Sequence, residues 1–145
     1  MVDKLKKYKA MAEERDLLKN KLEEIETSLY FPGSQRITDM PSGQPTGNPR
    51  EELAIKHIEL LARYKAIKAE LDSELLTLMS ALSKLEKPMH RKVLRLRYIE
   101  GMKVAEICDR EHYSRAQIHR IEKAALARLQ EIAKELKEND PETLH

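Results

Sequence analysis

The residues best suited to do chemistry lie at the start of a helix that we predict to begin at Ser114. Ser114 and Gln117 have the spacing of a capping box, in which the Ser hydroxyl accepts from the backbone N–H of Gln117 and the Gln side chain reaches back to the backbone N–H of Ser114. The outward positions of this helix are Arg115, Ala116, His119, Arg120 and Lys123. Arginine in the first turns of such a helix is the commonest reader of guanine in the major groove. The side chains predicted to probe base edges or the nearest phosphates are Arg115, Gln117, His119 and Arg120.

Three consecutive helices are predicted to position these side chains. They span about residues 88–99, 103–110 and 114–138, and short turns separate them. Apolar residues of the second and third helix recur at helical spacing on one face each, so we expect both faces to pack on the first helix. The residues expected in this core are Val93, Leu94, Leu96, Tyr98, Val104, Ile107, Cys108, Ile118, Ile121, Ala125, Leu126 and Leu129. The sequence therefore predicts an all-α fold in which residues 88–138 form a helix-turn-helix DNA-binding domain.

The positive charge of the chain is concentrated in the same segment. The net charge of the whole chain is +2, and residues 1–87 contain equal numbers of basic and acidic residues. Residues 90–130 hold ten Lys and Arg residues against five acidic residues. Such a local excess suits contact with the phosphates of double-stranded DNA, and the alternative is that these are ordinary solvated charges. The cations expected along the DNA backbone are Arg91, Lys92, Lys103 and Lys123.

The N-terminal part, residues 1–87, is predicted to form a long helical hairpin. Apolar residues recur at helical spacing over about residues 2–29 and again over about residues 50–86. The loop between them, residues 30–49, is rich in Pro and Gly and cannot continue either helix. The helices would cover each other's apolar stripes as in a coiled coil, and the longer second stripe leaves surface for another helix, the C-terminal domain or a second subunit. We therefore expect a homo-oligomer, most simply a dimer, and a frayed tail at residues 139–145.

Composition and motifs argue against an enzyme, a metal site and a membrane protein. The chain of 145 residues has 36% charged and 4% aromatic residues, which is typical of long exposed helices. Cys108 is the only cysteine, which fits a reducing cytoplasm. The five histidines are scattered and no catalytic motif occurs, so we predict no catalytic residue, no metal and no cofactor. The N-terminus is charged and no long apolar run occurs, so we predict that the chain has no signal peptide and no membrane span.

Two segments, Arg91–Cys108 and Tyr113–Leu129, resemble domain 4 of bacterial sigma factors. The first contains LRLRYIEG at residues 94–101, and the second follows it at the distance found in that domain. The residues of the second segment that match the pattern are Ser114, Ile118, Ile121, Ala125, Leu126 and Leu129. The resemblance implies a helix-turn-helix that binds DNA in transcription regulation. The base-reading positions that it implies are Arg115, Ala116, His119 and Arg120.

The chain departs from the sigma pattern at several points. Ala116 stands where a Glu is usual, and Ala cannot accept a hydrogen bond from cytosine, which implies a target other than the promoter element of sigma factors. His112 replaces the usual turn Gly, and Lys103 stands where an N-cap Thr is common. The chain shows no counterpart of the sigma domain that melts promoters, which argues against a working sigma factor.

As a whole, the chain is similar to the phage-encoded ArpU/RinA-type transcriptional regulators of Gram-positive bacteria. In that group a helical N-terminal part, a loop of the kind found here from Pro32 to Pro41 and a sigma-like C-terminal domain occur together. The resemblance implies control of phage late or packaging genes, usually by activation. We also expect the chain to act in the cytoplasm of a bacterial host, with RNA polymerase as a possible further partner. Two alternatives stay open: a helical adaptor that binds RNA polymerase or a phage protein, and a small DNA-packaging subunit.

Overall fold

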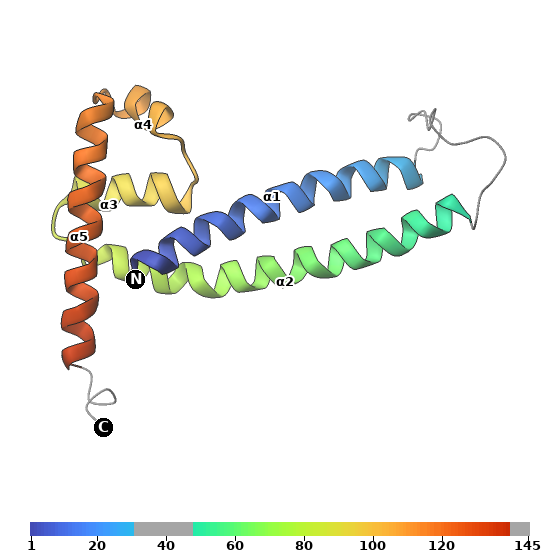
Figure 1. Cartoon of the computed structure of the whole chain (residues 1–145), viewed down its shortest axis with the longest axis horizontal. Coiled ribbons are helices and arrows are strands. Elements are labelled where there is room, and N and C mark those ends of the chain that lie inside the picture. Colours follow the sequence, from blue (N-terminus) through green and yellow to red (C-terminus); the bar gives the residue numbers. More distant parts are fainter. Residues whose placement is uncertain (31–47, 140–145) are drawn as a thin grey trace. The chain divides into compact units, whose positions relative to one another are not determined.

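Figure 1 shows the computed structural model of the chain, which describes residues 1–30 and 48–139. These residues form helices joined by turns and contain no strand, so the predicted all-α fold is confirmed. The helices are α1 (Val2–Tyr30), α2 (Pro49–Ser83), α3 (Pro88–Leu94), the π-helical turn η1 (Arg95–Ile99), α4 (Val104–Glu111) and α5 (Arg115–Asn139). In the described ranges, no helix combines the length and the apolar character needed to cross a membrane.

Parts of two predictions fall outside the described residues. They are the loop at 30–49, apart from its first and last residues, and residues 140–145 of the tail predicted at 139–145. The segment from Pro32 to Pro41, on which the likeness to ArpU/RinA-type regulators partly depends, is among them.

The chain divides into two compact units, which are described separately. One consists of Met1–Ala12 together with Leu71–His145, and we call it the C-terminal unit. The other is Glu13–Glu70, which we call the helix-pair unit. Both long helices contribute to both units, and a domain boundary at residue 87 stays a prediction.

In the helix-pair unit, α1 and α2 run antiparallel, as the predicted hairpin requires (Figure 1). Two polar contacts agree with this antiparallel arrangement. The guanidinium of Arg63 pairs with the carboxylate of Glu14, and Arg50 Nη2 donates to the carbonyl oxygen of Leu29 at 2.7 Å. On α1 the apolar stripe is buried at Leu22, Ile25 and Leu29. On α2 the stripe is only half-buried at Leu60, Leu61, Tyr64 and Ile67. Two helices alone therefore leave part of the stripe of α2 open to solvent.

The end of α2 lies three residues before the predicted end at residue 86. The α-helix stops at Ser83, and the backbone N–H of Leu85 donates to the carbonyl oxygen of Leu82 at 3.1 Å, a three-residue bond that tightens the last turn. Pro88 keeps Lys87 out of any helix, because a residue before proline is pushed out of the helical region. Lys87 is indeed extended, with φ −85° and ψ 123°.

The C-terminal unit contains the apolar core that the sequence predicts. Four side chains with no exposed surface form one cluster: Val93, Leu96, Ile107 and Ile118. The partly buried residues packed against it are Met89, Met102, Val104, Cys108 and Ile121. Leu94, Ala125 and Leu129 are also buried. α3, η1, α4 and α5 thus share a core, and the predicted three-helix arrangement is confirmed.

The sequence predicts one continuous helix over residues 88–99, but in the structure this segment is not uniform. After α3 the chain widens into the π-helical turn η1, in which the backbone N–H of Glu100 donates to the carbonyl oxygen of Arg95 at 2.9 Å. Gly101 follows with φ 70°, a conformation that glycine adopts without steric cost. The backbone N–H of Met102 then donates to the carbonyl oxygen of Leu96 at 2.9 Å and closes the helix end.

Candidate nucleic-acid interface

The turn between α4 and α5 fixes where α5 begins. His112 has φ 59° and ψ 41°, a left-handed conformation that His tolerates better than most residues, and its backbone N–H donates to the carbonyl oxygen of Cys108. The predicted capping box follows at once. The backbone N–H of Ser114 donates to Gln117 Oε1 at 2.8 Å, and the backbone N–H of Gln117 donates to Ser114 Oγ at 3.2 Å. The register of α5 is therefore the one that the sequence predicts.

One side of α5 is buried and the other is open to solvent. Ile118 and Ala125 have no exposed surface. The residues predicted to face a ligand are all exposed: Ser114, Arg115, Ala116, Gln117, His119, Arg120 and Lys123. Within residues 1–30 and 48–139, the cations Arg115, Arg120 and Lys123 have no ion-pair partner. Their charges are therefore available to an anion outside the chain.

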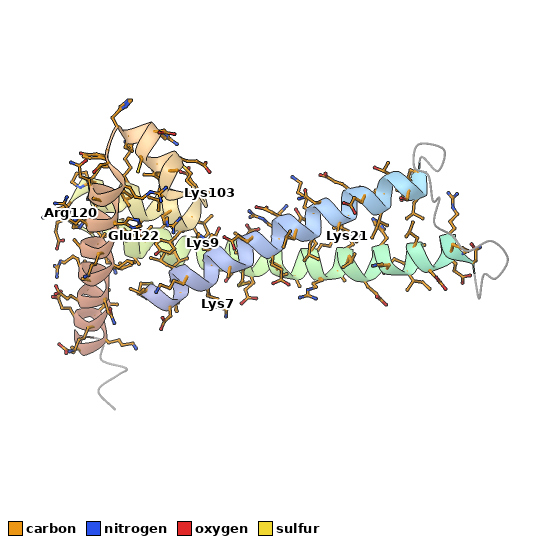
Figure 2. All side chains as sticks on the ribbon, turned by 45° about the horizontal axis from the view of Figure 1, so that its top comes forward. Lys7, Lys9, Lys21, Lys103, Arg120 and Glu122 are labelled. Carbon is orange, nitrogen blue, oxygen red and sulfur yellow. The ribbon has the colours of Figure 1, made fainter. Side chains whose placement is uncertain are left out.

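The carboxylate nearest to these cations along α5 is withdrawn from solvent. Glu122, labelled with Arg120 in Figure 2, has a side chain that is only 12% exposed. It accepts a hydrogen bond from the Tyr98 hydroxyl at 2.7 Å and lies 3.6 Å from Arg97 Nε. From Arg115 to Ala124, the solvent-exposed residues of α5 consequently include cations and no carboxylate. We call this exposed side of residues 115–124 the cationic face.

Two cations predicted to lie along DNA have partners within the fold. Arg91 Nη1 donates to the carbonyl oxygens of Leu85 at 2.6 Å and of Glu86 at 3.3 Å. The ammonium of Lys92 pairs with the carboxylate of Glu111, whose side chain is 10% exposed. These contacts tie α3 to the segment that follows α2 and to the last turn of α4. A phosphate contact by either cation stays a prediction.

Lys103, also predicted to contact phosphate, occupies the N-cap position of α4. It has φ −75° and ψ 154°, and its side chain makes no capping hydrogen bond. The side chain is exposed, and Figure 2 labels it at the start of the helix. A cation at the N-terminus of a helix is electrostatically unfavourable for the helix. The fold therefore gives no stabilising reason for a Lys at this position.

Behind the cationic face, Tyr98 and Glu122 form a contact that sequence reasoning missed. Burial is the main reason why the pKa of Tyr98 is raised to about 12, and the hydrogen bond to the carboxylate of Glu122 adds to this effect. The contact joins η1 to α5 and helps to orient the cationic face. The residues are 24 positions apart, so helical periodicity gives no signal for the pairing.

A second missed contact ties α5 to the segment that follows α2. Arg128 Nη2 lies 2.6 Å from Glu86 Oε1, and its Nη1 lies 3.1 Å from Glu131 Oε2 and 3.5 Å from Glu135 Oε1. The hydrogen bond from Arg128 is the largest cause that lowers the pKa of Glu86 to about 2. Arg128 belongs to the basic excess counted in the sequence, but acidic neighbours surround it. Arg128 therefore has its charge paired within the fold, whereas Arg120 on the same helix has no ion-pair partner in the described ranges.

Comparison with known proteins supports a family likeness for the C-terminal part of the chain. Residues 81–137 match the family described as Sigma-70, region 4. Comparisons with curated proteins and with solved structures gave no match. The matched segment contains α3, η1, α4 and nearly all of α5, and it extends on both sides of the stretch in which the sequence resembles sigma domain 4. Residues 81–137 are therefore similar to sigma-70 region 4 and form a helix-turn-helix of that type.

Proposed function

We propose that this chain is a sequence-specific DNA-binding transcription regulator that inserts the first turns of α5 into the major groove. The observation that carries the proposal is the cationic face, where Arg115, Arg120 and Lys123 are exposed and unpaired beside a start of α5 fixed by the capping box. The likeness of residues 81–137 to sigma-70 region 4 supports the same function. A helix-turn-helix places the N-terminal residues of its second helix against base edges.

In this proposal the exposed side chains divide into two groups. Those that face base edges or the nearest phosphates are Arg115, Ala116, Gln117, His119 and Arg120. Those that face the sugar–phosphate backbone or lie at its edge are Ser114, Lys123 and Lys103, with Arg91 and Lys92 nearby. About four to eight phosphate contacts would give a slope of about −4 to −7 in a plot of log K against log salt concentration.

A salt titration tests DNA binding directly. Fluorescence anisotropy of a labelled duplex is measured with the full chain from low to physiological ionic strength, and we expect a steep loss of affinity as salt rises. Arg115→Glu combined with Arg120→Glu should abolish binding, because both positions place a carboxylate against phosphate or base acceptors. If the full chain does not bind duplex DNA even at low ionic strength, the proposal is contradicted.

The finer proposal is that the chain activates late genes of a phage or prophage. It is supported by the sequence resemblance to ArpU/RinA-type regulators. Footprinting on the phage DNA that surrounds the gene should give a protected site upstream of late or packaging genes, and transcription with host RNA polymerase should rise when the chain is added. Retention of RNA polymerase without DNA binding would instead favour an adaptor.

We further propose that the helix-pair unit joins two copies into a dimer. Large apolar side chains are exposed there at Leu17, Ile55 and Ile58, with 69%, 51% and 67% of their surface open to solvent. A dimer would present two copies of α5 to half-sites about one DNA turn apart. Light scattering gives the number of subunits, and Leu17→Glu with Ile58→Glu should shift a dimer to monomer. A ring-sized oligomer would favour the packaging alternative.

A further inference from the structure

A shallow hollow lies on the cationic face beside the start of α5. It measures about 230 Å3 and is lined by Tyr113, Gln117, Arg120 and Ile121. Tyr113, the last residue before the cap, keeps 37% of its surface exposed, and Arg120 is exposed on the next turn of the helix (Figure 2). If α5 enters the major groove, this hollow is presented to base edges.

The capping box decides which hydrogen bonds Gln117 can offer in the hollow. The backbone N–H of Ser114 is only a donor, so the amide of Gln117 must turn its oxygen toward it, at 2.8 Å. The oxygen is thus already engaged in the cap. The two N–H donors on Nε2 point to no other partner in the described ranges. Gln117 therefore reaches a ligand mainly as a donor, because the oxygen that a bidentate pairing with adenine would use is turned toward the backbone of Ser114.

The other side chains that line the hollow are also mainly hydrogen-bond donors or apolar groups. The guanidinium of Arg120 only donates, and Ile121 and the ring of Tyr113 supply apolar surface. The Tyr113 hydroxyl can donate as well as accept. No carboxylate lines the hollow.

We infer that this hollow selects keto bases, guanine or thymine, and discriminates against adenine and cytosine. Guanine offers two acceptors in the major groove, and thymine offers one acceptor and a methyl group that fits apolar surface. Adenine and cytosine would each direct an amino group at side chains that are mainly donors, and an unsatisfied donor is costly at an interface. The inference rests on the proposed DNA binding and adds the class of base that is read. Gln117 is its specificity-determining residue.

Gln117→Glu tests the inference because it replaces the amino group of Gln117 that points to a ligand while it keeps the capping box with Ser114. One oxygen of the Glu can still accept from the backbone N–H of Ser114, since Ser-x-x-Glu is itself a capping box, and the second oxygen replaces the free donor by an acceptor. The binding site is first selected from random duplexes with the unaltered chain. Dissociation constants are then measured for all four base pairs at each position of that site.

We expect the unaltered chain to favour guanine or thymine by on the order of tenfold at one position, and Gln117→Glu to reverse this preference toward cytosine or adenine. Ala124→Glu is the control, since it adds the same charge to an exposed position on the same side of α5, two turns further along. The control should weaken all duplexes by one factor and leave the order of preference unchanged. Circular dichroism spectra and melting temperatures are measured to check that both variants are folded.

A second measurement needs no variant of the protein. Replacing the selected guanine by 7-deazaguanine removes one acceptor, and replacing a selected thymine by deoxyuridine removes the methyl group, so either change should weaken binding severalfold at that position alone. An unaltered chain that binds DNA but prefers adenine or cytosine opposite residue 117, or a Gln117→Glu chain with an unchanged preference, overturns the inference while the proposed function stands. Failure of the unaltered chain to bind any duplex overturns the proposed function itself.

Discussion

The two compact units differ in how their helices are held together. In the C-terminal unit, α3, η1, α4 and α5 share a core in which Val93, Leu96, Ile107 and Ile118 have no exposed surface. In the helix-pair unit, α1 and α2 contact each other along one stripe. One ion pair there, between Arg63 and Glu14, lies at the surface, with side chains 64% and 41% exposed.

This difference bears on which unit can present a site. Reading a base requires a side chain placed to a fraction of an ångström, and such placement needs neighbours that cannot move. A core formed by several helices provides such placement, because each buried side chain is in contact with neighbours on several sides. A two-helix stripe fixes neighbours along one line only. The cationic face is accordingly found on the unit with the multi-sided core, whereas the helix pair offers exposed apolar surface suited to association.

The largest expected effect comes from truncating one side chain of that core. Ile118→Ala should lower the free energy of unfolding by about 2–5 kcal/mol, because it removes buried methyl groups and leaves a cavity among packed helices. Ile67→Ala, at a half-buried position of the helix pair, should cost about 1 kcal/mol or less since solvent already reaches the site. Urea unfolding followed by circular dichroism compares the two, and equal losses would contradict the contrast between the units.

The next effect separates two arginines of the same helix. Arg120→Ala should weaken DNA binding by about 1–3 kcal/mol at the preferred site if the side chain reads a base. Arg128→Ala should leave the affinity for DNA nearly unchanged, because Arg128 is surrounded by Glu86, Glu131 and Glu135. The dissociation constants of the two variants are measured on the selected duplex and on an unrelated one. A uniform loss on both duplexes would reassign Arg120 to phosphate contact.

A smaller effect is expected from the buried polar contact behind α5. Tyr98→Phe removes the hydrogen bond to Glu122 and should lower the free energy of unfolding by about 1 kcal/mol. The raised pKa also predicts a pH dependence. The fold favours the protonated phenol, so its contribution to stability is complete below pH 10 and is lost as the pH rises from 10.0 through about 12. Over that interval the unaltered chain should lose more stability than Tyr98→Phe, and parallel losses would refute the assignment.

The helix-turn-helix was predictable because its signals are local. The capping box of Ser114 and Gln117, the turn at His112 and the apolar spacing of α5 each depend on residues within one or two helical turns. Once the start of α5 is fixed, the exposed positions follow from helical geometry. Similarly, Pro88 marks the start of α3.

The features that sequence reasoning missed depend on contacts between distant residues or on small changes of helical pitch. The pair of Tyr98 and Glu122 and the pair of Arg128 and Glu86 form only after the helices pack. Arg91 and Lys92 read as surface cations in the sequence, yet the fold gives them internal partners. The wider turn η1 has no residue type that marks it.

The exposed ion cluster of the C-terminal unit gives a further pH test. The pKa of Glu86 is lowered from 4.5 to about 2, so its contribution to stability is present above pH 4.5 and is lost as the pH falls toward 2. Glu86→Gln removes this titrating group and should therefore flatten the acid side of the stability profile between these pH values. Melting temperatures at a series of pH values measure the effect. An acid profile identical to that of the unaltered chain would show that Arg128 does not hold the carboxylate in solution.

The smallest effect should come from the surface contact of the helix pair. Arg63→Ala should lower the free energy of unfolding by about 0.2–1 kcal/mol, because the ion pair with Glu14 is exposed and water screens it. Raising the salt concentration should shrink the difference between Arg63→Ala and the unaltered chain. The double variant with Glu14→Ala completes the cycle, and its coupling energy isolates the pair from other effects of each substitution. A coupling as large as the cost of Tyr98→Phe, and insensitive to salt, would mean that the helix pair is held more rigidly than its open stripe implies, and the contrast between the two units would then need revision.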